Sequence, residues 1–134
     1  MRLVIDTNVI VSGLYSLDSP PGRLLEAASE RRIDLCAPEN VRVELDRVLR
    51  RVLDYGDREV AATLSALPIE WIEEEVYRQD LPFALGVLRD PDDAPILACG
   101  AALGCDIVSG DRDLQDARQK RVKVWKPAEV ARRG

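Results

Sequence analysis

Short apolar segments alternate with longer segments of helical periodicity along most of the chain, and this alternation limits the possible folds more than any other feature. Strands are predicted at residues 3–6, 33–36, 69–72, 106–109 and 122–125. Helices are predicted at about residues 23–31, 38–52, 57–66, 77–88 and 90–104, with a short one at the end. Strands that alternate with helices, with few hairpin signals, are typical of a parallel sheet covered on both faces. We therefore expect a three-layer α/β/α domain with a mainly parallel central sheet.

Prolines and apolar stripes locate the boundaries of the predicted helices. Residues 19–22, Ser-Pro-Pro-Gly, predict a loop that introduces the first helix, and Pro38 suits the first turn of the second. That helix has one apolar stripe, made of Val41, Leu45, Val48, Leu49 and Val52. Pro82 interrupts the helical pattern of residues 77–88, so the start of that helix is left open.

Length and composition predict one globular domain that covers residues 1–134. The chain is 46% hydrophobic and 32% charged, which is the balance of a globular protein rather than a disordered one. No apolar run approaches the roughly 20 residues that span a bilayer, and a strand-like segment begins at Arg2, so we expect no membrane span and no signal peptide. The expected compartment is the cytoplasm. In such a reducing compartment, Cys36, Cys99 and Cys105 are interpreted as small core side chains.

The chain contains no histidine. This excludes Ser-His-Asp and Cys-His catalysis, histidine general bases and nearly every zinc site. If the protein is an enzyme, its carboxylates are the side chains best suited to the chemistry.

The charge is unevenly distributed, although the net charge is −5. Residues 114–134 contain seven basic and two acidic side chains, whereas the rest of the chain is acidic. A basic end beside an acidic remainder suits phosphate binding in one place and cation binding in another, and a solvated tail is the alternative interpretation. The predicted phosphate contacts are Arg112, Arg118, Lys120, Arg121 and Lys123. Trp71 and Trp125 lie in predicted strands, where a core position is favoured over stacking on bases.

Four carboxylates are predicted to meet at one edge of the sheet. Asp6 ends the first strand and Asp111 follows the strand at 106–109, and ligands of open parallel sheets bind beyond the carboxyl ends of the strands. Asp93 lies in the first turn of the helix that leads into that strand, and Glu44 flanks the apolar stripe of its own helix. Each has a structural alternative: Asp6 and Asp93 as helix N-terminal acids, Asp111 as a turn residue, and Glu44 as a partner of a nearby arginine.

A convergent group of acids suits Mg²⁺ or Mn²⁺, which bind oxygen ligands. Without an ion, neighbouring carboxylates repel one another, and this repulsion lowers the stability of the folded protein. With bound ions, such a site activates a water and stabilises the charge that develops on a phosphate, and it needs no histidine.

Four sequence motifs resemble those of the PIN domain family of ribonucleases. The resemblance extends from Leu3 to Leu114 and rests on the segments 4–10 (Val-Ile-Asp-Thr-Asn-Val-Ile), 43–45 (Val-Glu-Leu), 90–98 (Asp-Pro-Asp-Asp-Ala-Pro-Ile-Leu-Ala) and 107–114 (Ile-Val-Ser-Gly-Asp-Arg-Asp-Leu). Pro95 is a departure from the family pattern that the first turn of a helix tolerates.

The resemblance implies a PIN-like fold and endonuclease action on RNA with Mg²⁺ or Mn²⁺. The implied metal ligands and catalytic residues are Asp6, Glu44, Asp93 and Asp111. Asp92 competes with Asp93 for the third position, and Asp93 is preferred because it directly precedes the Ile-Leu-Ala helix. The implied supporting residues are Asn8, Ser109 and Asp113. The resemblance further implies a toxin of a toxin–antitoxin pair, with a small antitoxin partner and a homodimeric state. The alternative is a PIN-like module that binds RNA or protein without cutting.

Overall fold

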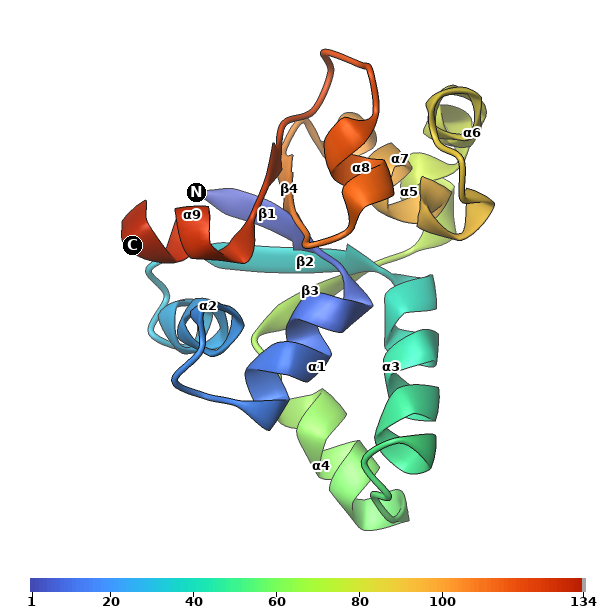
Figure 1. The fold of residues 1–134 in the computed structure, drawn as a ribbon. Coiled ribbons are helices and arrows are strands. Elements are labelled where there is room, and N and C mark those ends of the chain that lie inside the picture. The colour runs from blue at the N-terminus through green and yellow to red at the C-terminus, as the bar shows by residue number, and fades with distance from the viewer. Residues whose placement is uncertain (134) are drawn as a thin grey trace.

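A five-stranded sheet forms the centre of the computed structural model, which describes residues 1–133 (Figure 1). Its strands are β1 (Arg2–Ile5), β2 (Asp34–Pro38), β3 (Ile69–Ile72), β4 (Asp106–Val108) and β5 (Val124–Trp125). The strand order is β3-β2-β1-β4-β5, and all four pairings are parallel. The predicted parallel sheet is therefore confirmed.

Helices cover both faces of the sheet (Figure 1). One layer contains α1 (Thr7–Tyr15), α2 (Pro20–Ser29), α3 (Glu39–Arg51) and α4 (Asp57–Ala66). The other contains α5 (Glu74–Tyr77), the 3₁₀ turn η1 (Arg78–Asp80), α6 (Leu81–Val87), the 3₁₀ turn η2 (Pro91–Asp93), α7 (Ala94–Leu103) and α8 (Arg112–Asp116). The last helix, α9 (Pro127–Arg133), packs against α2. The predicted three-layer α/β/α architecture is confirmed.

The core lies between β1 and the helices on both sides of it. Leu3, Val4 and Ile5 are fully buried, because β2 and β4 flank β1 and helices cover both of its faces. A strand in this position reads as a continuous apolar run rather than an alternating one. On the second layer, the middle of α7 is buried as well and contacts β1, β2 and β4. This double cover holds the carboxyl end of β1 in a fixed place.

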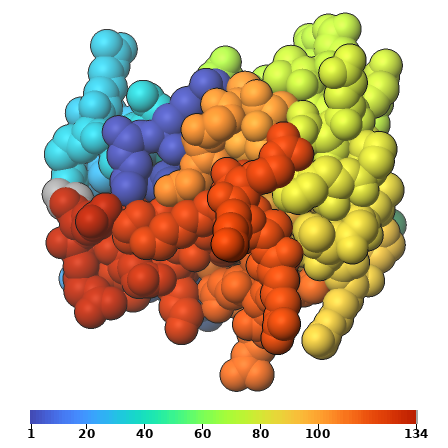
Figure 2. Space-filling view, turned by 90° about the horizontal axis from the view of Figure 1, so that it is seen from above, coloured from blue at the N-terminus to red at the C-terminus, as the bar shows by residue number. Residues whose placement is uncertain are grey.

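The order of the strands creates a switch point between β1 and β4. From β1 to β3 the chain crosses over by α1–α4, and from β3 to β4 it crosses over by α5–α7 on the opposite face. The two crossovers therefore diverge at neighbouring strands, and a crevice opens at their carboxyl ends. Figure 2 shows the C-terminal part of the chain, in orange and red, between the N-terminal segments in blue and the α5–α6 region in yellow-green.

The helix α1 and the start of α2 correct the sequence-based expectations. No helix was predicted after Asp6, yet α1 begins at Thr7 because Asp6 caps it and Val9 and Ile10 are buried. The loop predicted at residues 19–22 is wrong: Ser19 is the N-cap of α2, and the two prolines occupy its first turn. Proline is accepted there because the missing N–H has no helical partner. A side chain on Gly22 would collide with the carbonyl oxygens of residues 16 and 17.

Several boundaries differ by a few residues. The region predicted as one helix at 77–88 is divided between α5, η1 and α6, with Pro82 in the first turn of α6. Gly104 ends α7 in a left-handed conformation, with φ of 64°. Val52 lies beyond α3 and is 70% exposed, so it does not belong to the apolar stripe.

The remaining expectations concern single side chains and membrane spans. Trp125 is buried, as expected for a strand residue, and Cys36 and Cys99 lie in the core. Hydrogen bonding with Cys105 lowers the pKa of Cys36, but hydrogen bonding with Cys99 and burial raise it to about 11, so the side chain is a neutral thiol. Among residues 1–133, no helix combines the length and the apolar character that crossing a bilayer requires.

Candidate active site

Asp6 lies directly after β1 and is buried at the switch point. Its Oδ1 accepts a hydrogen bond from the Val9 N–H at 3.0 Å, which caps α1, and its Oδ2 accepts one from the Ser109 hydroxyl. Burial raises the pKa of this carboxyl, the two hydrogen bonds lower it, and the charges of Asp111 and Glu44 add to the increase. Asp6 therefore combines the capping role with a position among other acids.

Ser109 joins the ends of β1 and β4. It is fully buried, its hydroxyl donates to Asp6, and the same oxygen accepts the Asp111 N–H at 2.9 Å. Its carbonyl accepts a hydrogen bond from the Gln115 side chain at 2.8 Å. Since each bond involves a different segment, Ser109 fixes Asp6 and Asp111 relative to each other. The supporting role that the resemblance implies for Ser109 stays a prediction.

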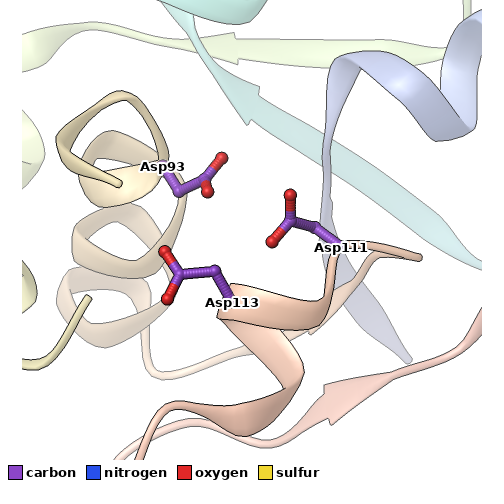
Figure 3. Close-up of side chains that lie close together, drawn as sticks. All are labelled: Asp93, Asp111 and Asp113. Atoms are coloured by element: carbon purple, nitrogen blue, oxygen red, sulfur yellow. The ribbon is translucent and has the colours of Figure 1, made fainter. Parts of the chain in front are cut away.

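The carboxylates of Asp93 and Asp111 face each other, and Asp113 lies beside them with its carboxylate turned away from Asp111 (Figure 3). One oxygen from each lies within 4.8 Å of the others. Asp93 precedes α7, whereas Asp111 caps α8 by accepting the Leu114 N–H at 3.2 Å. We call these three residues the acid group.

Asp93 is the member of the acid group with a buried oxygen, Oδ2, that has no hydrogen-bond partner in the described chain. Burial, followed by the charges of Asp111, Asp90, Asp113 and Asp6, raises its pKa to about 7. A buried acceptor without a donor costs free energy, and a cation supplies what it lacks.

Asp113 has a different environment from its two neighbours. Its two oxygens accept backbone hydrogen bonds from Arg89 at 3.1 Å and from Asp90 at 2.9 Å. These bonds connect α8 to the segment immediately before η2, which carries Asp93. Asp113 therefore links the two segments that supply the acid group.

A cleft of about 730 Å³ opens above these residues. Its lining includes the four predicted ligands and Asn8, together with Thr7, Asn40, Val43, Arg47, Asp90, Pro91, Asp92, Pro95 and Ile96. Glu44 is half-buried on α3, and no ion pair of its side chain occurs within residues 1–133. The structure thus brings Asp6, Glu44, Asp93 and Asp111 to one concave surface.

Two further polar residues of the cleft were missed by sequence reasoning. The side-chain oxygens of Thr7 and Asn40 are buried without a hydrogen-bond partner in the described chain, like Asp93 Oδ2. Thr7 lies within the opening motif, between two residues that were selected. Asn40 has no sequence signal, because only the packing of the first turn of α3 brings it to the cleft.

The structure distinguishes some candidates that the sequence left together. Asp93 belongs to the acid group, whereas Asp92 is exposed, so the geometry favours Asp93 as the third ligand.

Among the basic candidates, Arg112, Arg118 and Lys120 are exposed. Arg121 pairs with Asp80 at 2.6 Å and lies over Phe83, and Lys123 lies over Trp125. The latter two are therefore already engaged by the protein.

Comparisons with known proteins agree with this geometry. A family model described as the PIN domain matches residues 2–113. No curated protein matches the sequence significantly. The fold is similar to VapBC2 from Rickettsia felis bound to a DNA fragment from the promoter, with a TM-score of 0.68, 16% identity, and coverage of 94% of this chain and 98% of that one. It is also similar to DNA-bound VapBC from Salmonella typhimurium, with a TM-score of 0.70, 15% identity, and coverage of 95% and 98%.

Proposed function

The chain belongs to the PIN domain family, and we propose on this basis that it is a metal-dependent endoribonuclease that hydrolyses RNA phosphodiester bonds. One observation carries the proposal. Three carboxylates from two segments lie within 4.8 Å of one another, two of them, Asp93 and Asp111, line the cleft, and Asp93 keeps a buried oxygen without a partner. Such an arrangement lowers stability unless a cation or its bound water occupies it.

The residues fit Mg²⁺ or Mn²⁺. All the donors are oxygen atoms, as these ions require, and an Mg²⁺ ion takes only one or two protein carboxylates while keeping several waters. We propose Asp6, Glu44, Asp93 and Asp111 as the ligands. Asp113 assists them from the acid group. When bound, the ion supplies a water of lowered pKa and offsets the negative charge of the transition state.

The protein's own residues contribute position and electrostatics. The Ser109 hydroxyl and the Val9 N–H hold both oxygens of Asp6, so that this carboxylate keeps one orientation. Asn8 is exposed beside it in the cleft and presents an amide to a substrate or a water. Arg47 also lines the cleft and offers positive charge to an RNA phosphate.

We propose further that the protein is the toxin of a toxin–antitoxin pair, inhibited by a small antitoxin, and that it forms a homodimer in the cytoplasm. The support is the likeness of its fold to chains of two VapBC structures. Copurification with the product of a neighbouring short reading frame tests the partner, and sedimentation equilibrium tests the dimer.

Cleavage of generic single-stranded RNA in Mn²⁺ tests the nuclease activity. We expect internal cuts that EDTA prevents and that Asp6→Asn abolishes, while Asp18→Asn, which changes an exposed acid outside the lining of the cleft, leaves the rate unchanged. Asparagine retains an oxygen for capping α1, so loss of activity reports on the carboxylate rather than on folding. RNA binding without cleavage would instead favour a non-catalytic binding module.

A further inference from the structure

A second cavity lies beside the acid group, and its lining is rich in arginine. It has a volume of about 540 Å³ and lies between the segment 86–89, which includes the end of α6, and the segment 112–118. Its three basic side chains, Arg89, Arg112 and Arg118, come from both segments. We call it the arginine pocket. In Figure 2 these two segments, yellow and orange-red, lie against each other.

The three guanidinium groups have no partner among residues 1–133. None of them forms an ion pair or a side-chain hydrogen bond there. The acids of the lining are Asp113 and Asp116, and both oxygens of Asp113 already accept backbone hydrogen bonds. Unlike Arg121 and Lys123, the arginine pocket therefore offers charge that the protein itself does not use.

The position of the arginine pocket relative to the cleft is fixed by Asp113. This residue belongs to the acid group and also lines the arginine pocket. Its Oδ1 accepts the backbone N–H of Arg89, so the loop that carries this arginine is fastened to α8, which begins with Arg112. The arginine pocket therefore lies directly beside the acid group.

We propose that the arginine pocket binds a backbone phosphate of the RNA strand next to the phosphate that is cleaved. The inference rests on the proposed function and specifies how that site holds its substrate. Guanidinium groups bind phosphate oxygens through two parallel hydrogen bonds, and three of them around one cavity give it the positive charge that suits a backbone phosphate. The acidic floor of the cleft holds cations and repels RNA, so a neighbouring anion site is what retains the strand.

Binding of a fluorescent oligouridine, measured by anisotropy over a range of salt concentrations, tests this proposal. The background is Asp6→Asn, which keeps the RNA intact. In this background the double variant Arg89→Gln and Arg118→Gln is compared with a control double variant, Arg23→Gln and Arg58→Gln. The control residues are exposed arginines on α2 and α4, in the other helical layer, and they remove the same charge.

We expect the arginine-pocket variant to bind RNA several-fold more weakly than the background protein. The slope of log affinity against log salt should fall by roughly 0.7 for each lost phosphate contact. The control variant should keep both values, and circular dichroism should show that both variants are folded. An unchanged slope, or an equal loss in the control variant, overturns the proposal.

The outcome separates the arginine pocket from the nuclease activity. If the wild-type chain cuts RNA in Mn²⁺ but the arginine-pocket variant binds normally, the phosphate site is wrong and the proposed function stands. If only the arginine-pocket variant loses RNA binding and the wild-type chain never cuts, the phosphate site stands and the catalytic proposal fails. A wild-type chain that neither binds nor cuts RNA overturns both.

Discussion

Strand β4 has an aspartate near each end, and the carboxylates at the two edges of the sheet have different surroundings. At the amino end, the Asp106 carboxylate accepts hydrogen bonds from the Lys123 N–H at 3.2 Å and from the Trp125 indole at 3.0 Å. Nearby, Arg2 pairs with Glu70 at 2.9 Å. At the carboxyl end, Asp111 faces two other carboxylates, and Asp93 Oδ2 has no partner within the described residues.

The comparison shows at which edge of the sheet the charged side chains stabilise the fold and at which edge they do not. At the amino edge Asp106, Arg2 and Glu70 each have a partner from another part of the sheet, so they contribute to holding the strands together. At the carboxyl edge like charges are gathered and one polar atom is buried without compensation, which is unfavourable for folding. A protein keeps such an arrangement where a bound ligand offsets its cost, so we expect the carboxyl edge to be the functional one.

Exchanging the acid at either end for its amide gives the largest expected difference. Asp111→Asn should lower the rate of Mn²⁺-dependent RNA cleavage more than about 100-fold, because even residues that only support metal ligands cost up to that factor. Asp106→Asn should leave the rate unchanged and lower the free energy of unfolding by about 1 kcal/mol through weaker hydrogen bonds. Equal loss of activity in both variants would remove the distinction between the two edges.

Divalent cations should stabilise the protein through the carboxyl edge alone. At an Mn²⁺ concentration a hundredfold above its dissociation constant, the free energy of unfolding should increase by about 2.7 kcal/mol. Thermal denaturation followed by circular dichroism measures this increase. Asp93→Asn should remove most of it, whereas Asp106→Asn should retain it. If Mn²⁺ stabilises neither the wild-type protein nor Asp106→Asn, the distinction between the two edges of the sheet fails.

The stability of the metal-free protein should decrease as the pH rises from about 4 to 7. The pKa of Asp93 is raised to about 7 in the folded state, against about 3.9 in an unfolded chain. Between these values the folded state binds more protons, so its stability is greatest below the unfolded pKa and is lost as the pH rises through the folded one. Asp93 is partly exposed, and screening by solvent keeps this effect smaller than that of ion binding.

Urea denaturation in EDTA at a series of pH values measures the dependence. Asp93→Asn should flatten it over this range, and Asp18→Asn, at an exposed acid, should not. If the wild-type curve is already flat, the acids at the carboxyl edge are not repelling one another.

The smallest expected effect belongs to the ion pair at the amino edge. Arg2 and Glu70 are 39% and 66% exposed, and exposed pairs contribute only about 0.2–1 kcal/mol. A double-mutant cycle with Arg2→Met and Glu70→Gln should give a coupling energy in this range that decreases with salt. A larger coupling that salt does not change would show that this edge is more than a solvated surface.

Much of the fold follows from sequence because local patterns and tertiary packing agree there. The strand at 69–72 and the helix at 57–66 have the predicted bounds. Helix α1 was missed because Val9, Ile10 and Val11 are β-branched residues, which favour strands when packing is ignored. Only the burial of this segment against α2 and α3 makes the helix favourable.

The candidate site divides in the same way. The positions of Asp6 and Asp111 follow from a general rule about the carboxyl ends of parallel strands. The place of Asp113 within the acid group does not, because it depends on how the loop at residues 89–90 folds back onto α8. The position of Asn40 in the cleft could not be predicted for the same reason, because its surroundings come from elements distant in sequence.

The two backbone hydrogen bonds to Asp113 affect the rate at which the site takes up a cation. These bonds partly offset the negative charge of one carboxylate, so that the three acids lie close together before any ion binds. The entropy of assembling the site is then lost during folding rather than during each encounter with a cation. We expect ion uptake to need no rearrangement of the loop, so that its rate is set by the exchange of water on the incoming ion.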